Sequence, residues 1–296
     1  MAVDAATALT QSFRYEDRYL IPWTRLGPPS AQPVVFIHGT PWSSRLWAPF
    51  ALALSSTYSV YLFDNPGYGE SQTFGEGTSE QANDGPLEKQ AEVFAALLKH
   101  WGLDKAPHVV AHDNAGLASL RAVLTHGCRY RSLCLVDVVA VGPWGLPFFQ
   151  LVSENSEVFN QIPADMFQGI VRGFIRSAAF KPLNPSAEEM LAKPWLSDGK
   201  QGQSGFIRQM CQAARRRSAD VEPRYREVGT SGLPVKIIWG KDDQWLPVEK
   251  AEKMRELIGG NTEVVIVEDA GHLIHLDQPE RLMAELLLFL NKLDSQ

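Results

Sequence analysis

Residues 109–117, with the sequence VVAHDNAGL, decide the fold. A short apolar run of the kind found in buried strands ends here, small residues permit a sharp turn, and a helix-like segment begins. This strand–turn–helix context is typical of a nucleophile elbow, in which a strained turn exposes the nucleophile at the end of a strand. Serine usually occupies the centre of such a turn, and Asp113 occupies it here. The alternative interpretation is that Asp113 only caps the helix, a position where aspartate is favoured.

Short apolar runs of the same type recur along the chain. Their length suits strands that helices bury on both faces. The runs lie at 34–37, 60–63, 108–111, 133–136, 235–239 and 264–267. Helix-like stretches separate several of them or follow the last, at 87–100, 117–125, 248–257 and 279–290. Residues 13–23 alternate polar and apolar side chains, as a pair of strands would. This alternation predicts an α/β fold, with a mostly parallel central sheet flanked by helices and joined by right-handed crossovers.

One long interval, residues 141–228, interrupts the alternation. It contains no convincing strand, and proline-punctuated helical pieces occupy 148–159, 164–179 and 205–217. We therefore expect one core domain, formed by residues 1–140 and 229–296, with a helical insertion at 141–228 between two strands of its sheet.

The turn after the first buried run, HGTPWSS at residues 38–44, is a second candidate part of the site. A glycine-led turn at this point can aim a backbone N–H at the reacting centre. We expect the N–H groups of Thr40 and Asn114 to form an oxyanion hole. His38 precedes the glycine, and it is either a substrate contact or a structural hydrogen-bonding group.

Two later loops carry candidates for an acid and a histidine. The segment WGKDDQWLP follows a late strand, and the loop after the last strand contains His272. An acid that orients the histidine is expected in the first of these loops. Asp243 is the preferred residue, although Asp242 could take this role if Asp243 caps the next helix. His275 is expected to be a packing or solvent-facing residue. The order Asp113, Asp243, His272 matches nucleophile, acid and histidine for this architecture.

Composition and charge restrict the class of partner. The chain has 296 residues, 45% of them hydrophobic, and a net charge of −6, which argues against nucleic acid because that partner selects a basic face. The one basic cluster, at 215–217, is interpreted as a solvated helix face. Three cysteines without paired spacing suit a reducing compartment. Since no signal peptide and no run of about 18 apolar residues is found, we expect a cytoplasmic protein without a membrane span.

Together these segments resemble the α/β-hydrolase superfamily over nearly the whole chain. Within it, HGTPWSS at 38–44, GYGES at 67–71 and the aspartate at the elbow resemble the branch of haloalkane dehalogenases, haloacetate dehalogenases and epoxide hydrolases. The resemblance implies that residues 141–228 form a cap over the active site. It also implies an alternative seat for the acid at Asp137, before the cap, although the WGxxDxxxP pattern favours Asp243.

The sequence departs from each named subfamily. Haloalkane dehalogenases usually carry tryptophan after the nucleophile and often asparagine after His-Gly, where this chain has Asn114 and Thr40. The arginines that follow the nucleophile in haloacetate dehalogenases are missing. The cap tyrosines of epoxide hydrolases are missing too, since no tyrosine lies between Tyr130 and Tyr225. The residues that we expect to bind substrate are Trp144, Trp195, His38 and Pro41.

An aspartate nucleophile suits displacement at a saturated carbon, because a carboxylate is ionised at neutral pH and needs no base. We expect a small apolar substrate to form an ester with Asp113, which water activated by His272 then hydrolyses. Carbon–halogen cleavage is the preferred reaction, and epoxide hydrolysis is the first alternative. The others are a cofactor-free esterase, carbon–carbon hydrolase or lyase with Asp113 as a base, and a non-catalytic ligand receptor. No metal or cofactor is expected, and the protein is expected to be a monomer or homodimer.

Overall fold

The computed structural model of the protein describes residues 2–73, 87–103, 105–143, 147–197, 199–212 and 218–294. The strands are β1 (Gln11–Tyr15), β2 (Tyr19–Leu26), β3 (Pro33–Ile37), β4 (Ser59–Phe63), β5 (Gln72–Thr73), β6 (His108–His112), β7 (Ser132–Val136), β8 (Val235–Gly240) and β9 (Thr262–Val267). The helices beside the sheet are α1 (Ala2–Ala6), α2 (Ala48–Leu54), α3 (Leu87–Trp101), α4 (Ala115–His126), α10 (Tyr225–Thr230), α11 (Glu249–Ile258), α12 (Ile274–Asp277) and α13 (Pro279–Asp294). The helices of the insertion, between β7 and β8, are α5 (Pro147–Glu154), α6 (Ser156–Gln161), α7 (Ala164–Arg176), α8 (Pro185–Leu196) and α9 (Lys200–Gln212). Two 3-10 turns occupy Ser44–Trp47 and Glu222–Arg224.

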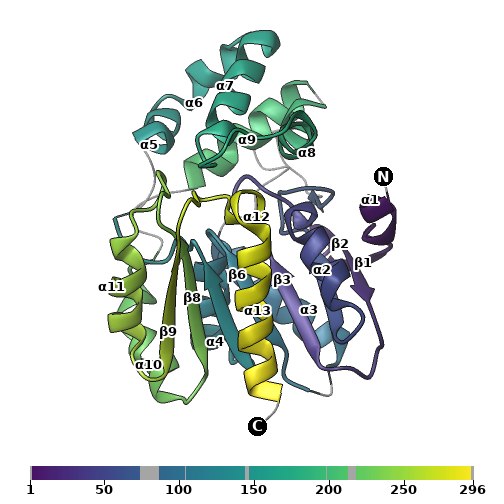
Figure 1. Cartoon of the computed structure of the whole chain (residues 1–296). Helices are drawn as coiled ribbons and strands as arrows, with labels where there is room; N and C mark the ends of the chain where they lie inside the picture. Colours follow the sequence, from purple (N-terminus) through teal and green to yellow (C-terminus); the bar gives the residue numbers. More distant parts are fainter. Residues whose placement is uncertain are drawn as a thin grey trace.

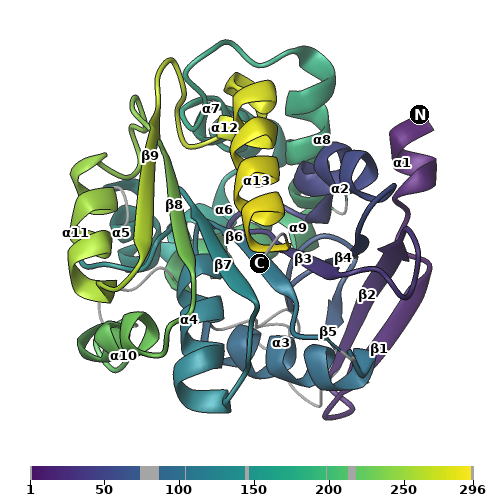
Figure 2. The ribbon, with the colours of Figure 1, turned by 60° about the horizontal axis from the view of Figure 1, so that its bottom comes forward.

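The central sheet is mostly parallel, as predicted. Its strand order is β1-β2-β4-β3-β6-β7-β8-β9, with β5 beside β2, and Figure 2 shows this order from β9 to β1. Strands β4, β3, β6, β7, β8 and β9 run parallel to one another, whereas β2 pairs antiparallel with β1, β4 and β5. The carboxyl ends of the parallel strands therefore lie along one edge of the sheet, where sites form in open α/β sheets.

Alternate residues of the inner strands enter two separate cores. In β3, Val35 and Ile37 pack into the cluster that includes α3, α4 and α11. Val34 and Phe36 pack into the cluster of α2 and α13, the helices that lie in front of the sheet in Figure 1. Because both faces are covered, every residue of β3, β4, β6, β7 and β8 is buried. This burial explains why these strands appear in the sequence as nearly continuous apolar runs.

The insertion between β7 and β8 lies mainly above the carboxyl ends of the strands, where Figure 1 shows α5 to α9. The helix expected at 148–159 is two helices, because Asn155 leaves helical geometry between α5 and α6. The helix α8 was not predicted; its N-cap is Asn184, whose side chain accepts the N–H of Ala187. The expected domain boundary at residue 228 falls inside α10, which packs against α4 and α11 beside the sheet.

Other expected helices differ from the observed ones only at their ends. The helix expected at 164–179 ends at Arg176, and the one expected from residue 205 begins at Lys200. The basic cluster at 215–217 lies outside the described residues. None of the described helices combines the length and the hydropathy that crossing a bilayer would require.

Candidate active site

Asp113 lies at the tip of the sharp turn between β6 and α4. Its φ of 55° is in the left-handed region, which non-glycine residues seldom adopt, and its side chain is buried. Gly39 lets the neighbouring loop approach, because a Cβ there would collide with Asp113 Oδ1. Gly116, in the first turn of α4, lets that helix pack closely against Val138, because a Cβ at this position would collide with the Val138 side chain. The small residues around Asp113 are therefore needed for the close packing of this turn.

His272, in the loop after β9, joins Asp113 to Asp243. Its Nε2 lies 3.2 Å from Asp113 Oδ2, and its Nδ1 lies 2.9 Å from Asp243 Oδ2. The backbone N–H groups of Trp245 and Leu246 donate to the other Asp243 oxygen at 2.7 and 2.9 Å. The ring and both carboxylates are buried. The structure thus brings the three expected catalytic residues together, with Asp243 orienting the ring toward Asp113.

The surroundings of His272 favour its protonated form. Burial alone would lower its pKa, but the charges of Asp243 and Asp113 and their hydrogen bonds outweigh burial and raise the pKa to about 10. Trp245 stacks on the ring, with 4.8 Å between centroids. At neutral pH the resting site therefore holds an imidazolium between two carboxylates.

This charge predicts a pH dependence of stability. A histidine in the unfolded chain has a pKa of about 6.5. Between that pH and about 10, the folded state therefore binds more protons at His272 than the unfolded state does. Its contribution to the unfolding free energy is complete below pH 6.5 and is lost as the pH rises through 10. We expect the unfolding free energy, measured by urea denaturation from pH 6 to 10.5, to decline less steeply with pH in His272→Gln than in the wild type. Parallel curves for the two proteins would contradict the raised pKa.

Asp137, the alternative seat for the acid, has a different environment. It lies at the end of β7 with a φ of 43°, fully buried, and its Oδ1 accepts the N–H of Gly240 at 2.7 Å. Burial, and then the charge of Asp243, raise its pKa well above the usual value, so the site favours the neutral form of this carboxyl more than water would. The acid that is hydrogen-bonded to His272 is Asp243 and not Asp137.

A polar cluster surrounds Thr40, next to Asp113. The Thr40 N–H donates to Asp113 Oδ1 at 2.7 Å, where one half of an oxyanion hole was expected. The Asn114 side-chain amide donates to the Thr40 hydroxyl at 2.7 Å. The backbone N–H of Asn114, the other expected donor, is not among the groups bonded to this carboxylate in the described residues. Of the two backbone N–H groups expected to form the oxyanion hole, the one that donates to the Asp113 carboxylate in the described residues is therefore that of Thr40.

Tyr68 completes this cluster, although it was not among the residues expected at the site. Its hydroxyl shares a hydrogen bond of 2.6 Å with the Thr40 hydroxyl, and its ring meets Trp195 edge to face. Burial raises the pKa of Tyr68 above its usual value, so the phenol keeps its proton at neutral pH. The GYGES motif at 67–71 is the only local indication of this residue, and the motif says nothing about which side chain the ring reaches.

Two other histidines considered for the site, His38 and His275, have structural environments. The His38 ring donates from Nδ1 to Gly39 O at 3.0 Å and accepts the Asn65 N–H at Nε2, at 2.9 Å. Because both ring nitrogens are engaged and the residue is fully buried, His38 holds the turn, which is the structural role that the sequence left open beside substrate binding. His275 is buried against Trp47, as a packing residue. Among the described residues, no three His, Cys, Asp or Glu side chains form a group suited to a metal ion.

Trp195 and Pro41, both expected at the substrate, contact each other. The Trp195 Nε1–H donates to the Pro41 carbonyl at 2.8 Å. This hydrogen bond joins α8 of the insertion to the loop that carries Thr40. Trp144, the other expected tryptophan, lies outside the described residues.

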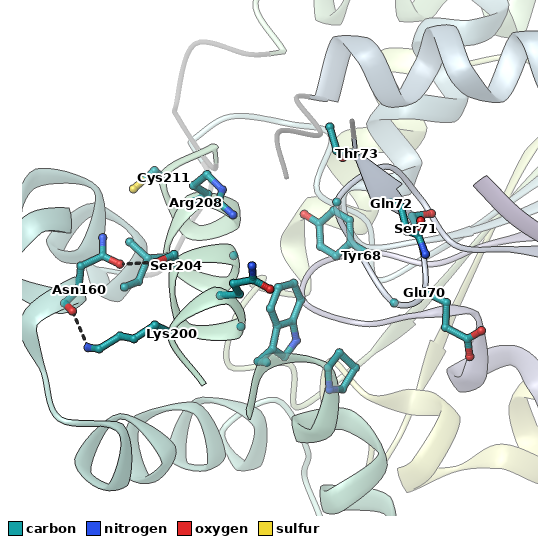
Figure 3. Close-up of a pocket in the computed structure, with 18 of the residues that line it drawn as sticks. Tyr68, Glu70, Ser71, Gln72, Thr73, Asn160, Lys200, Ser204, Arg208 and Cys211 are labelled. Carbon is teal, nitrogen blue, oxygen red and sulfur yellow. Dashed lines mark hydrogen bonds between the residues drawn. The ribbon is translucent and has the colours of Figure 1, made fainter. Parts of the chain in front are cut away.

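A cleft of about 1750 Å³ opens between the insertion and the core (Figure 3). Tyr68 and Trp195 belong to its lining, with 5.9 Å between their ring centroids. On the insertion side, Lys200 donates to the Asn160 carbonyl at 2.9 Å and the Ser204 hydroxyl donates to the Asn160 side chain, also at 2.9 Å. The cleft therefore reaches the two aromatic side chains that contact the loop of Thr40.

Comparison with known proteins agrees with this architecture. The sequence matches the alpha/beta hydrolase family over residues 34–285. A solved structure from Burkholderia ambifaria, described as an alpha/beta hydrolase fold protein, is 35% identical with a TM-score of 0.85, over 94% of this chain and 97% of that chain. The dihydrolipoyllysine-residue acetyltransferase component of the acetoin cleaving system of Pseudomonas putida is 25% identical, over 92% of this chain and 67% of its own length.

Solved structures of several activities share the fold. A haloalkane dehalogenase variant from Agrobacterium tumefaciens is 18% identical with a TM-score of 0.79, over 97% of this chain and 99% of that chain. Esterases are among the other similar structures, so the matches confirm the expected superfamily without singling out the expected branch. The family match spans most of the sequence and includes the turn at Asp113. The chain therefore belongs to the alpha/beta hydrolase family.

Proposed function

We propose that this chain is a hydrolase in which Asp113 attacks a small apolar substrate and forms a covalent ester. The observation that carries this proposal is the bonding of the Asp113 carboxylate, whose Oδ1 accepts the Thr40 N–H and whose Oδ2 lies 3.2 Å from His272 Nε2. A side chain that only capped α4 would instead accept N–H groups in the first turn of that helix. The N-cap position of α4 is Asn114, and its side chain makes no capping bond.

In the first step, Asp113 Oδ2 attacks a saturated carbon, and the new C–O bond forms as the leaving group departs with the bonding electron pair. No base is required, because the nucleophile is already anionic. The ester of Asp113 is neutral, so it no longer stabilises the imidazolium of His272. The pKa of His272 falls, and its proton passes to solvent. For a halogenated substrate, the products of this step are halide, one proton and the ester.

In the second step, neutral His272 takes a proton from water as the water oxygen attacks Cγ of Asp113. The Thr40 N–H stabilises the oxyanion that develops on Oδ1, and removing one such donor typically costs on the order of 3 kcal/mol. Asp243 holds the Nδ1–H and stabilises the transient imidazolium. The Cγ–Oδ2 bond then breaks, and His272 returns the proton to the departing alcohol. The acid formed at Asp113 gives its proton to His272, which restores the carboxylate and the imidazolium of the resting site.

An aromatic wall supports a small apolar substrate. Trp245 stacks on His272, Trp42 lies nearly parallel to Trp245 at 5.7 Å, and Phe174 contacts Trp245 at 4.4 Å between centroids. Such a wall favours an apolar ligand over a strongly hydrated one. Since halide leaves without needing a proton donor, cleavage of a carbon–halogen bond is the leading reaction.

Epoxide hydrolysis is the second candidate, and Tyr68 favours it. Opening an epoxide creates an alkoxide that needs a proton, which a phenol can donate. The Tyr68 hydroxyl is bonded to Thr40, whose N–H bonds Asp113. A protonated donor is therefore available in the polar cluster beside the nucleophile, although the insertion lacks the tyrosines of known epoxide hydrolases.

Tyr68→Phe is expected to separate the two reactions. Loss of the acid should lower kcat for an epoxide by about 10²-fold or more, whereas halide leaves without a proton and its release should change little. The measurement compares a 1,2-epoxyalkane with the 1-bromoalkane of equal chain length. Tyr130→Phe is the control, because Tyr130 is a buried tyrosine whose hydroxyl bonds the Ser119 carbonyl instead. Equal losses on both substrates would assign the Tyr68 hydroxyl a structural role.

The proposal as a whole is tested with haloalkanes, epoxides and esters offered to the wild-type protein. Release of halide or formation of diol would support an Asp113 ester. Hydrolysis of esters alone, with no label on Asp113, would contradict it and favour an esterase in which Asp113 is a base.

A further inference from the structure

Asp277 connects the loop after β9 to residues 177–181, here called the post-α7 segment. Its Oδ2 accepts the backbone N–H groups of Gly271 and Phe180 at 2.9 and 2.8 Å. Its Oδ1 accepts the N–H of Lys181 at 2.9 Å, and the Lys181 ammonium donates to the Asp277 carbonyl at 2.8 Å. Asp277 is only 3% exposed, so water cannot readily replace these bonds.

Two further hydrogen bonds join the post-α7 segment to the active site. The Leu273 N–H donates to the Ala178 carbonyl at 2.9 Å. The Trp245 Nε1–H donates to the Ser177 hydroxyl at 3.0 Å, and the same indole stacks on His272. The post-α7 segment is therefore bonded to the residue after His272 and to the ring that covers it.

The two backbones approach so closely at Gly271 that a side chain does not fit. A Cβ there would lie 2.8 Å from the Phe180 nitrogen and 2.9 Å from the Ala178 oxygen. Both are backbone atoms, which cannot rotate aside as the end of a flexible side chain could. Glycine is therefore required at the position directly before His272 for the contact to form.

We propose that Asp277 is a positioning residue that keeps His272 in register with Asp113 by clamping its loop to the post-α7 segment. This inference rests on the proposed function, in which His272 is the base for ester hydrolysis. The ring is then correctly placed only while the post-α7 segment, and with it the insertion, is docked. Loss of the clamp slows hydrolysis of the ester and not its formation, since formation needs no base.

Asp277→Asn puts an NH₂ group where an oxygen accepted backbone N–H groups. We expect ester hydrolysis to slow about 10²-fold, the effect of a displacement of about 1 Å at a catalytic group. Ester formation stays close to the wild-type rate, so rapid-quench mass spectrometry during turnover of a bromoalkane shows the ester accumulating. Asp277→Glu, which restores the carboxylate, recovers part of the hydrolysis rate. Gly271→Ala, which keeps the carboxylate but separates the backbones, accumulates the ester as Asp277→Asn does.

Hydrogen–deuterium exchange tests the clamp without any chemistry. In Asp277→Asn, the amides of 178–181 and of 271–273 are expected to lose protection together, while those of β6 and β8 keep it. Glu285→Gln is the matched control. It weakens another buried ion pair, in which Lys236 Nζ, near the start of β8, lies 2.6 Å from Glu285 Oε2. This variant should lower thermal stability without accumulating ester and without deprotecting the two segments.

The outcomes separate the clamp from the proposed function. Continued protection of 271–273 in Asp277→Asn refutes the clamp, and so does rapid ester hydrolysis in that variant when His272→Gln accumulates ester. If no protein forms an ester, including His272→Gln, the proposed function fails. The exchange result then decides by itself whether Asp277 couples the two segments.

Discussion

Asp113→Asn is expected to abolish turnover while leaving the fold intact. The amide has nearly the shape of the carboxylate and can keep the bond from the Thr40 N–H, but it is uncharged and a poor nucleophile toward saturated carbon. We expect activity to fall about 10⁴-fold or more, as it does when the nucleophile is removed from other triad enzymes. Initial rates on the best substrate, with circular dichroism of the same samples, measure the effect.

Asp137→Asn is the matched control for this experiment. Asp137 is also a buried acid with positive φ at the end of a strand. It is not the acid bonded to His272, and an amide can still accept the Gly240 N–H through its oxygen. Its activity should stay close to that of the wild type. Equal losses in the two variants, or full activity of Asp113→Asn, would show that Asp113 is not the nucleophile.

His272→Gln is expected to stop the reaction halfway. Asp113 needs no base for its attack, so the ester still forms, but no group then takes the proton from water. Steady-state turnover should fall by about 10²- to 10⁴-fold, the usual contribution of a general base. Intact-protein mass spectrometry should show a gain of one alkyl group from a haloalkane, or of the whole substrate from an epoxide, with one equivalent of halide released in the first case.

Peptide mapping identifies the residue that carries the added mass. We expect it on the peptide that contains Asp113, and the double variant with Asp113→Asn should show none. An adduct on another residue would contradict the assignment. No adduct from a substrate that the wild type turns over would exclude the two-step path and favour Asp113 as a base.

The accuracy of the sequence predictions followed the strength of the local pattern. The strand expected at 108–111 is observed at His108–His112, one residue longer, because the apolar run of Val109, Val110 and Ala111 suits a strand buried on both faces. The break at Asn155 and the whole of α8 were not foreseen. The insertion helices pack largely against one another, and Pro194 lies inside α8, where proline normally argues against a helix.

By itself the sequence determined the α/β class, the elbow at Asp113 and the order in which an acid and a histidine follow it, because each depends on neighbouring residues. Only the tertiary structure decided that Asp243, and not Asp137, bonds His272. It alone showed that Tyr68 reaches Thr40 and that a carboxylate after β9 joins the insertion to the histidine loop. These contacts join residues far apart in the chain, and strand order and side-chain packing set their distances, which a local pattern cannot specify.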